Sequence, residues 1–300
     1  MLAKMRRLKK IVGRLMETTV PKSGATYFKP ALLLLLVLVI SRESLAQTVV
    51  PLKKYVGHLK TLDVMVQDKS FSFIFDTGGG ETIISPEIAE MLHRSVYGKN
   101  TGFRMLGERV EFQRCDEVTL KISGLDFHLP QVAVWDIMSI LPKGFPKLDG
   151  VVSLHTFSNH KLTLDLPNHQ LLIETERSFK SRIRAMTPVA AIFSTGLQGR
   201  EINLLIDIPI KGKNYRFLFD TGNIDKTKLA PQTALEMGLR YDAGAKSRLE
   251  VGKIKLQIGQ KLIETEAVIE NVIYDGALDF GFISQSVFTM DLPHQKVWMR

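Results

Sequence analysis

The sequence has few of the features that mark several other classes of protein. It holds one cysteine, Cys115, among 300 residues, so no disulfide can form within the chain and the fold depends on its apolar core. Its longest apolar run, residues 31–40, spans about 15 Å as a helix, half of a ~30 Å hydrocarbon layer. The histidines lack metal-ligand spacing, and the glycines at 78–80 lack the lysine of a phosphate-binding loop. We therefore expect neither a metal nor a nucleotide cofactor.

The net charge of +9 is concentrated at the start of the chain. Residues 1–46 carry +7, which leaves +2 for residues 47–300. A protein that binds nucleic acid needs a basic field over its folded body. We therefore expect no nucleic-acid partner.

The first 46 residues have the composition of an export signal. Basic residues precede the apolar run 31–40, and Ser44-Leu45-Ala46 then places small residues at the two positions that a signal peptidase recognises. We expect a signal peptide over residues 1–46 and an exported protein, periplasmic or secreted, that meets the membrane only transiently through this segment. The alternative is an uncleaved segment that anchors the protein to a membrane.

Residues 73–78, Phe-Ile-Phe-Asp-Thr-Gly, are the stretch around which the chain is organised. Apolar residues on both sides of the pleat predict a strand buried on both faces, which Gly78 ends. A carboxylate at the buried end of a strand is costly unless it is well hydrogen-bonded or takes part in chemistry. Residues 217–222, Phe-Leu-Phe-Asp-Thr-Gly, repeat the pattern. Asp76 and Asp220 are therefore candidates for a working pair.

Other landmarks recur around the two motifs in the same order. They are a helix start (85–87 and 230–232), a glycine followed by two apolar residues (150–152 and 281–283) and an Asp-Leu-Pro hairpin (165–167 and 291–293). We infer that a β-rich unit is duplicated within the chain. The predicted organisation is an N-terminal lobe over residues 47–175, a linker over 176–200 and a C-terminal lobe over 201–300.

Two copies of one unit tend to pack about a pseudo-two-fold axis, which would bring Asp76 and Asp220 face to face. Two adjacent carboxyl groups share one proton, and such a pair can activate a water molecule against a peptide carbonyl without a metal or a nucleophilic side chain. The glycines that follow, Gly78 and Gly222, allow the tight turn that presents the two acids. The threonine hydroxyls between them can hydrogen-bond to the opposite motif.

This twin Asp-Thr-Gly arrangement resembles the aspartic protease family, and its units look closer to bacterial retropepsin-like proteases than to pepsin. The resemblance implies an all-β fold of two pseudo-symmetric barrel lobes with short helices. It implies an aspartic endopeptidase that acts on a peptide or protein, as a monomer. Asp76 and Asp220 would be catalytic, and Thr77 and Thr221 would interlock. The substrate-covering flap of the family would correspond to residues 96–107, with Tyr97 and Phe103.

The chain departs from the family after each glycine, where Ser, Thr or Ala is usual. Asn223 could replace that hydroxyl, but Gly79 could not, except through backbone or a neighbour such as Thr82. Three alternatives therefore stay open. The protein could be a peptide- or protein-binding module with weak or no turnover, Asp76 and Asp220 could be turn-capping acids, or each unit could pair with its counterpart in another chain.

Overall fold

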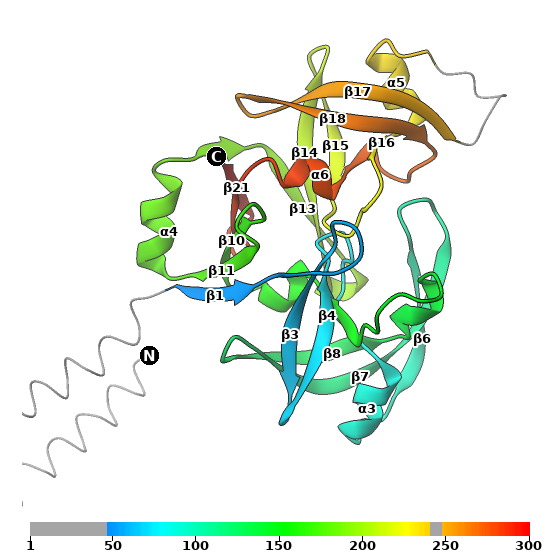
Figure 1. Cartoon of the computed structure of the whole chain (residues 1–300), viewed down its shortest axis with the longest axis vertical. Coiled ribbons are helices and arrows are strands. Elements are labelled where there is room, and N and C mark those ends of the chain that lie inside the picture. Colours follow the sequence, from blue (N-terminus) through cyan, green and yellow to red (C-terminus); the bar gives the residue numbers. More distant parts are fainter. Residues whose placement is uncertain (1–46, 241–247) are drawn as a thin grey trace, which may run out of the picture. The chain divides into compact units, whose positions relative to one another are not determined.

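The computed structural model describes residues 47–240 and 248–300, so the predicted signal peptide lies outside the described residues. Strands dominate the described part, and its helices are short, which confirms the all-β prediction. The strands form three sheets (Figure 1): one belongs to the first half, one to the second, and one is shared by both.

The first half folds into an eight-stranded sheet that carries the first Asp-Thr-Gly motif. Its strands, in spatial order, are β2 (Lys53–Lys54), β3 (Lys60–Val66), β4 (Lys69–Phe75), β9 (Gly150–Val152), β5 (Ile83–Ile84), β8 (Leu125–Val134), β7 (Arg109–Ile122) and β6 (Tyr97–Phe103). Apolar side chains alternate along β7, so that Val118, Leu120 and Ile122 are buried between exposed residues. The motif follows β4 directly.

The second half repeats this layout in a seven-stranded sheet. Its strands, in spatial order, are β13 (Ala191–Gly196), β14 (Glu201–Ile210), β15 (Lys213–Phe219), β19 (Gly276–Leu278), β16 (Thr227–Leu229), β18 (Lys261–Glu270) and β17 (Arg248–Ile258). Its order matches that of the first sheet, in which only β6 has no counterpart. In both sheets the motif strand, β4 or β15, runs parallel to a three-residue strand, β9 or β19, with the same register. The structure therefore contains the internal duplication that the sequence predicts.

The closing hairpins of both halves meet in a third, six-stranded sheet. Its order is β1 (Thr48–Pro51), β11 (Gln170–Glu174), β10 (Lys161–Asp165), β20 (Phe288–Asp291), β21 (Lys296–Met299) and β12 (Thr187–Val189). The central pair joins the halves, with Leu162 opposite Met290. Residues 176–200, predicted as a linker, contain α4 (Glu176–Ile183), β12 and β13 and so supply strands to two sheets.

Short helices follow each motif, as the sequence predicts. The helix α3 (Pro86–Met91) begins after Ser85, whose hydroxyl accepts the N–H of Ile88 at 3.3 Å, and α5 (Pro231–Glu236) begins after Ala230 without a side-chain cap. The other helices of the described residues are α6 (Phe280–Ile283) and the 3₁₀ turns η1 (Ile137–Ile140), η2 (Leu154–Phe157) and η3 (Leu197–Gly199).

One of the predicted correspondences is wrong. Gly150 lies beside Phe73, and its counterpart beside Phe217 is Gly276, not Gly281, which lies in α6. A Cβ on Gly150 would lie 2.3 Å from the Phe73 ring, and one on Gly276 would lie 2.4 Å from the Phe217 ring. Phe73 and Phe217 therefore each require a glycine at the paired position of the neighbouring strand. An Asp-Gly pair precedes two apolar residues in both copies, and this was the missed signal.

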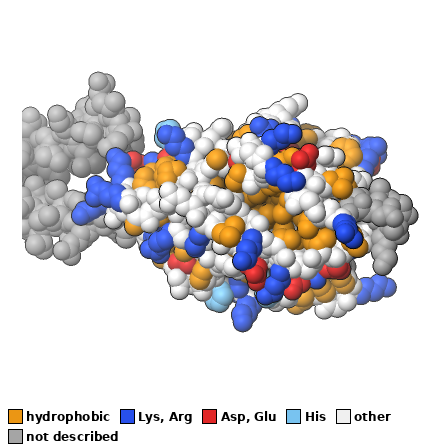
Figure 2. All heavy atoms as spheres, turned by 90° about the horizontal axis from the view of Figure 1, so that it is seen from above, with side chains coloured by type: hydrophobic (Ala, Val, Ile, Leu, Met, Phe, Trp, Pro, Cys, Tyr) orange, Lys and Arg blue, Asp and Glu red, His pale blue; other side chains and the backbone are white. Residues whose placement is uncertain are grey.

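The surface of the folded part mixes charges of both signs. Figure 2 shows Lys and Arg side chains spread over the visible face among acidic and apolar ones, without one basic patch. Within residues 47–240 and 248–300, no helix is both long and apolar enough to cross a membrane.

Candidate active site

The two Asp-Thr-Gly motifs lie against each other and are held by reciprocal hydrogen bonds. The hydroxyl of Thr77 donates to the carbonyl of Phe219 at 2.6 Å and accepts the N–H of Thr221 at 3.0 Å. The hydroxyl of Thr221 donates to the carbonyl of Phe75 at 3.1 Å and accepts the N–H of Thr77, also at 3.1 Å. Both threonines are fully buried. The structure thus contains the threonine interlock that the resemblance implies.

The interlock brings the carboxyl groups of Asp76 and Asp220 together. A Cβ on Gly78 would lie 2.4 Å from Cγ of Asp220, and a Cβ on Gly222 would lie 2.6 Å from Cγ of Asp76. Each glycine is therefore packed against the carboxyl group of the opposite motif, where no side chain fits. Each aspartate also accepts the N–H of the glycine in its own motif, at 2.9 Å for Asp76 and 2.8 Å for Asp220. These acids cap their own turns, and they also face each other.

The environment of the pair favours a single shared proton. Burial raises the pKa of both carboxyl groups, because a charge is poorly solvated there. The pKa of Asp220 is raised further by the negative charge of Asp76, whereas hydrogen bonds from Asp220 and from backbone N–H groups oppose the rise at Asp76. The pair therefore keeps a shared proton to a higher pH than a lone aspartate would.

The run of three glycines after Asp76 is fixed by close contacts. A Cβ on Gly79 would lie 3.1 Å from Val151 and 3.2 Å from an oxygen of Asp76. Gly80, at φ +63°, lies against the side chain of Glu201 from the second half. The carbonyl of Gly80 accepts the N–H of Ile202 at 3.2 Å. The backbone of this turn is thus held from both halves of the molecule.

The side chains expected to replace the missing hydroxyls have other hydrogen-bond partners. The Asn223 side chain accepts the N–H of Asp225 and donates to the carbonyl of Lys226, both at 3.3 Å, so it closes its own loop. The Thr82 hydroxyl pairs with Thr156 at 2.6 Å and lies 3.3 Å from that of Ser153. The side chains of these two residues are therefore engaged elsewhere, whereas the backbone N–H groups of Gly79 and Asn223 hydrogen-bond to Asp76 and Asp220 and oppose the rise of their pKa values, so backbone is the substitute that the structure supports.

The predicted flap region is a hairpin formed by β6 and β7. At its tip, the carbonyl of Met105 accepts the N–H of Ile273 at 2.9 Å, which ties the hairpin to the second half. Tyr97 lies near the hairpin base, where its hydroxyl hydrogen-bonds to Asp116 and Gln131. Phe103 is 63% exposed. The hairpin thus extends from one half to the other, with Phe103 uncovered.

Tyr274 is a neighbour of the pair that the sequence did not single out. It is half-buried in the segment that Ile273 fastens to the hairpin tip. Burial raises the pKa of its hydroxyl, and the charges of Glu201 and Asp220 raise it further, which places the hydroxyl within the field of the carboxyl pair. No short motif marks this tyrosine, since its position depends on the fold.

Comparison with known proteins agrees with this geometry. Residues 62–154 match a family described as aspartyl protease, and this stretch includes Asp76. The resemblance to aspartic proteases is thereby confirmed. Asp220 lies beyond the matched residues, so its place in an aspartic protease site rests on the repeat and on the contacts above. No curated protein has a sequence that matches this chain.

Two solved structures have the same fold. One is a basic 7S globulin from soybean, with a TM-score of 0.51 at 9% identity. The matched part covers 85% of this chain and 95% of the globulin chain. The other is conglutin gamma, a basic 7S globulin from lupine seeds, with a TM-score of 0.50 at 10% identity and the same coverage. Identities this low show the shared fold alone, and both proteins are named as globulins.

Proposed function

We propose that this protein is an aspartic endopeptidase that hydrolyses peptide bonds with Asp76 and Asp220. The observation that carries the proposal is the packing of each motif glycine against the opposite carboxyl group, which holds the two acids within reach of one water molecule. The ionised acid of the pair would take a proton from this water as its oxygen attacks the peptide carbonyl carbon. The protonated acid would donate its proton to the carbonyl oxygen, which gives a tetrahedral diol. The first acid would then pass the proton taken from the water to the nitrogen as the C–N bond breaks, and the second acid would recover its proton from a diol hydroxyl as the carbonyl re-forms.

Catalysis by this route needs one proton on the pair, which sets its pH range. Because burial raises the pKa of Asp220 well above the ordinary value, the protonated form persists as the pH rises from acidic values. Activity should therefore be greatest at acidic to weakly acidic pH and should fall once the pair loses its shared proton. We also propose that the protein is exported and acts as a monomer, since one chain holds both motifs.

A second candidate function is a peptide- or protein-binding module that keeps the fold with weak or no turnover. Gly79 favours it, since the hydroxyl usual at this place is missing. At the matching place in the second motif, the side chain of Asn223 hydrogen-bonds within its own loop. The likeness to globulins is compatible with it. This module would still hold an extended peptide near the two acids.

The test is cleavage of a denatured protein mixture between pH 3 and 7 by the wild type, Asp76→Asn and Asp220→Asn. Asp126→Asn serves as the matched control, because this acid is exposed and paired only with Lys121. We expect cleavage by the wild type and the control and none by the two motif variants. Full activity in either motif variant would refute the paired mechanism, whereas peptide binding without cleavage at any pH would support the binding module. Sedimentation of the active form as a monomer would exclude pairing of two chains.

A further inference from the structure

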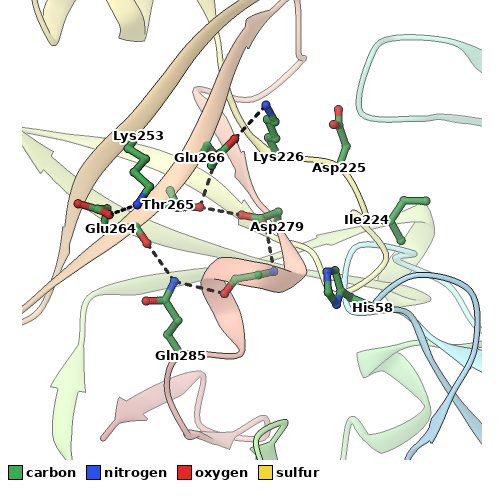
Figure 3. Close-up of a pocket in the computed structure, with 11 residues that line it drawn as sticks. His58, Ile224, Asp225, Lys226, Lys253, Glu264, Thr265, Glu266, Asp279 and Gln285 are labelled. Carbon is green, nitrogen blue, oxygen red and sulfur yellow. Dashed lines mark hydrogen bonds and ion pairs between the residues drawn. The ribbon is translucent and has the colours of Figure 1, made fainter.

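The turns that follow the two motifs are held in different ways. After Asp220, the chain opens onto a pocket of about 350 Å³ that Ile224 and Asp225 line, with His58 beside them from the first half (Figure 3). The carboxylate of Asp225 accepts a hydrogen bond from Arg248 at 3.0 Å, which lies in the same half. The chain after Asp220 is therefore fastened within the half that contains it.

The glycine turn of the first motif is instead held by residues 200–203 of the second half. The N–H of Ile202 donates to the carbonyl of Gly80 at 3.2 Å, and a Cβ on Gly80 would lie 2.8 Å from the Glu201 side chain. Glu201 is fixed in turn, because its carboxylate accepts a hydrogen bond from the amide of Asn203 at 2.6 Å. The backbone of this turn therefore depends on a segment of the opposite half.

The same segment reaches the base of the predicted flap through Arg200. The guanidinium of Arg200 donates to the side-chain oxygen of Gln131 on β8 and, at 2.7 Å, to that of Gln198. The amide of Gln131 donates in turn to the hydroxyl of Tyr97 on β6 at 2.6 Å. A chain of hydrogen bonds thus connects Arg200 to the β6–β7 hairpin.

The charges around Arg200 restrict its side chain further. Glu81, which follows Gly80, forms a buried ion pair with Arg114, whose side chain is 3% exposed. Burial raises the pKa of Glu81, and the positive charges of Arg114 and Arg200 oppose the rise, so Arg200 lies within the field of this pair. The Nε of Arg200 is buried and has no partner among the described residues, so its two terminal nitrogens make its hydrogen bonds. The guanidinium is therefore confined to one arrangement.

We propose that Arg200 is a positioning residue that sets the predicted flap in register with the turn that presents Asp76. The inference rests on the proposed function, because the flap and the two acids would enclose the same peptide. One short segment would hold the turn through Ile202 and the flap through Arg200, so a peptide under the flap would lie at a fixed place relative to Asp76. Loss of Arg200 would therefore weaken binding of the peptide more than the chemical step.

The first test compares cleavage of one fluorogenic peptide by the wild type, Arg200→Met and Gln131→Leu. Methionine keeps the apolar stem of the arginine and removes its donors, and Gln131→Leu breaks the chain of hydrogen bonds one step further on. We expect KM to rise about 10-fold in each variant and kcat to change by less than about twofold. Because both residues act along one path, the double variant should be no worse than either single variant, whereas independent effects would multiply and overturn the proposal.

Two further variants separate position from charge. Arg177→Met is the matched control, because Arg177 is an exposed arginine on α4, and it should leave KM and kcat unchanged. Arg200→Lys keeps the positive charge but replaces the two terminal nitrogens with one, so it cannot bind Gln131 and Gln198 as arginine does. We expect KM to stay raised in Arg200→Lys. A wild-type KM in this variant would assign the effect to charge and overturn the positioning role.

Amide hydrogen exchange separates this inference from the proposed function, because it needs no activity. In Arg200→Met we expect exchange in β6, residues 97–103, to be at least about fivefold faster than in the wild type, with no change in β16. This result would support the connection even if no peptide is cleaved. Wild-type exchange in β6 would overturn it, and so would an unchanged KM in Arg200→Met, which would leave the protease standing.

Discussion

Thr77 and Thr221 each accept the backbone N–H of the other, at 3.1 and 3.0 Å, across the boundary between the two halves. Each hydroxyl also donates to the carbonyl of the residue that precedes the opposite aspartate. Four buried hydrogen bonds therefore fix the separation of the two acids. The interlock connects stability to catalysis, because any slip between the halves would move the carboxyl groups apart.

Thr77→Val should weaken both properties, because valine has the shape of threonine but leaves the carbonyl of Phe219 and the N–H of Thr221 buried without partners. We expect a loss of about 3 kcal/mol in the free energy of unfolding, measured by urea denaturation, and a fall of at least about 10-fold in kcat/KM. Thr77→Ser keeps the hydroxyl and should retain most of both. A Thr77→Val protein as stable as the wild type would show that the interlock contributes nothing.

Gly222→Ala should abolish cleavage while the rest of the fold persists. The new Cβ would lie 2.6 Å from Cγ of Asp76, so the carboxyl group must move away from Asp220. Asp126→Asn is again the control, since it changes an exposed acid outside both motifs and outside the predicted flap. We expect a loss of activity of about 10³-fold for the first variant and of less than about twofold for the second, compared by peptide cleavage and by circular dichroism. Equal activity in both would contradict the packing of Gly222 on Asp76.

The stability of the fold should fall as the pH rises through the range in which the carboxyl pair ionises. Burial raises the pKa of Asp76 and Asp220 above that of aspartate in the unfolded chain. At a pH between the unfolded-state pKa and the raised folded-state pKa, the folded protein therefore binds more protons than the unfolded protein. The stabilisation from this proton is complete at low pH and is lost as the pH rises toward the raised pKa. Asp220→Asn, which cannot ionise, should gain in Tm relative to the wild type from about pH 4 upward. Parallel Tm profiles for the two proteins would contradict a raised pKa.

Gly79→Ser should shift the acidic limb of the activity profile to lower pH. The serine Cβ would lie 3.2 Å from an oxygen of Asp76, so its hydroxyl can donate to this carboxylate and lower its pKa. Gly79→Ala adds the same carbon without the hydroxyl and is the control for crowding against Val151, 3.1 Å away. We expect both variants to lose about 1 kcal/mol of stability and only the serine variant to shift the limb, measured as kcat/KM against pH. The same shift in both would assign it to crowding.

The sequence predicts the elements that depend on local patterns. The strands that end at Asp76 and Asp220, the short helices after each motif and the closing hairpins all follow from apolar runs, proline positions and turn residues. The duplication could be predicted because the same signals recur in order, and duplication in turn brings the two acids together.

The sequence could not predict contacts that arise only when the halves pack. Gly276 is identified as the counterpart of Gly150 by its position opposite Phe217, whereas Gly281 had the more similar following residues but forms a helix. Asn223 has the chemistry to replace a hydroxyl, yet its side chain turns into its own loop. The pocket that Ile224 lines also includes His58 from the opposite half, so no single segment of the sequence predicts it.

The six-stranded sheet determines when the chain can finish folding. Its central pair joins β10 of the first half to β20 of the second, and β20 and β21 lie between Phe288 and Met299. During synthesis, the first half emerges with the edge of β10 unpaired, which is a site for unwanted strand pairing. The native sheet can close only once β20 has paired with β10, a contact between residues more than 120 positions apart, so we expect this step of folding to be slow. Disruption of β20, for example by Thr289→Pro, should therefore damage the first half as well as the second.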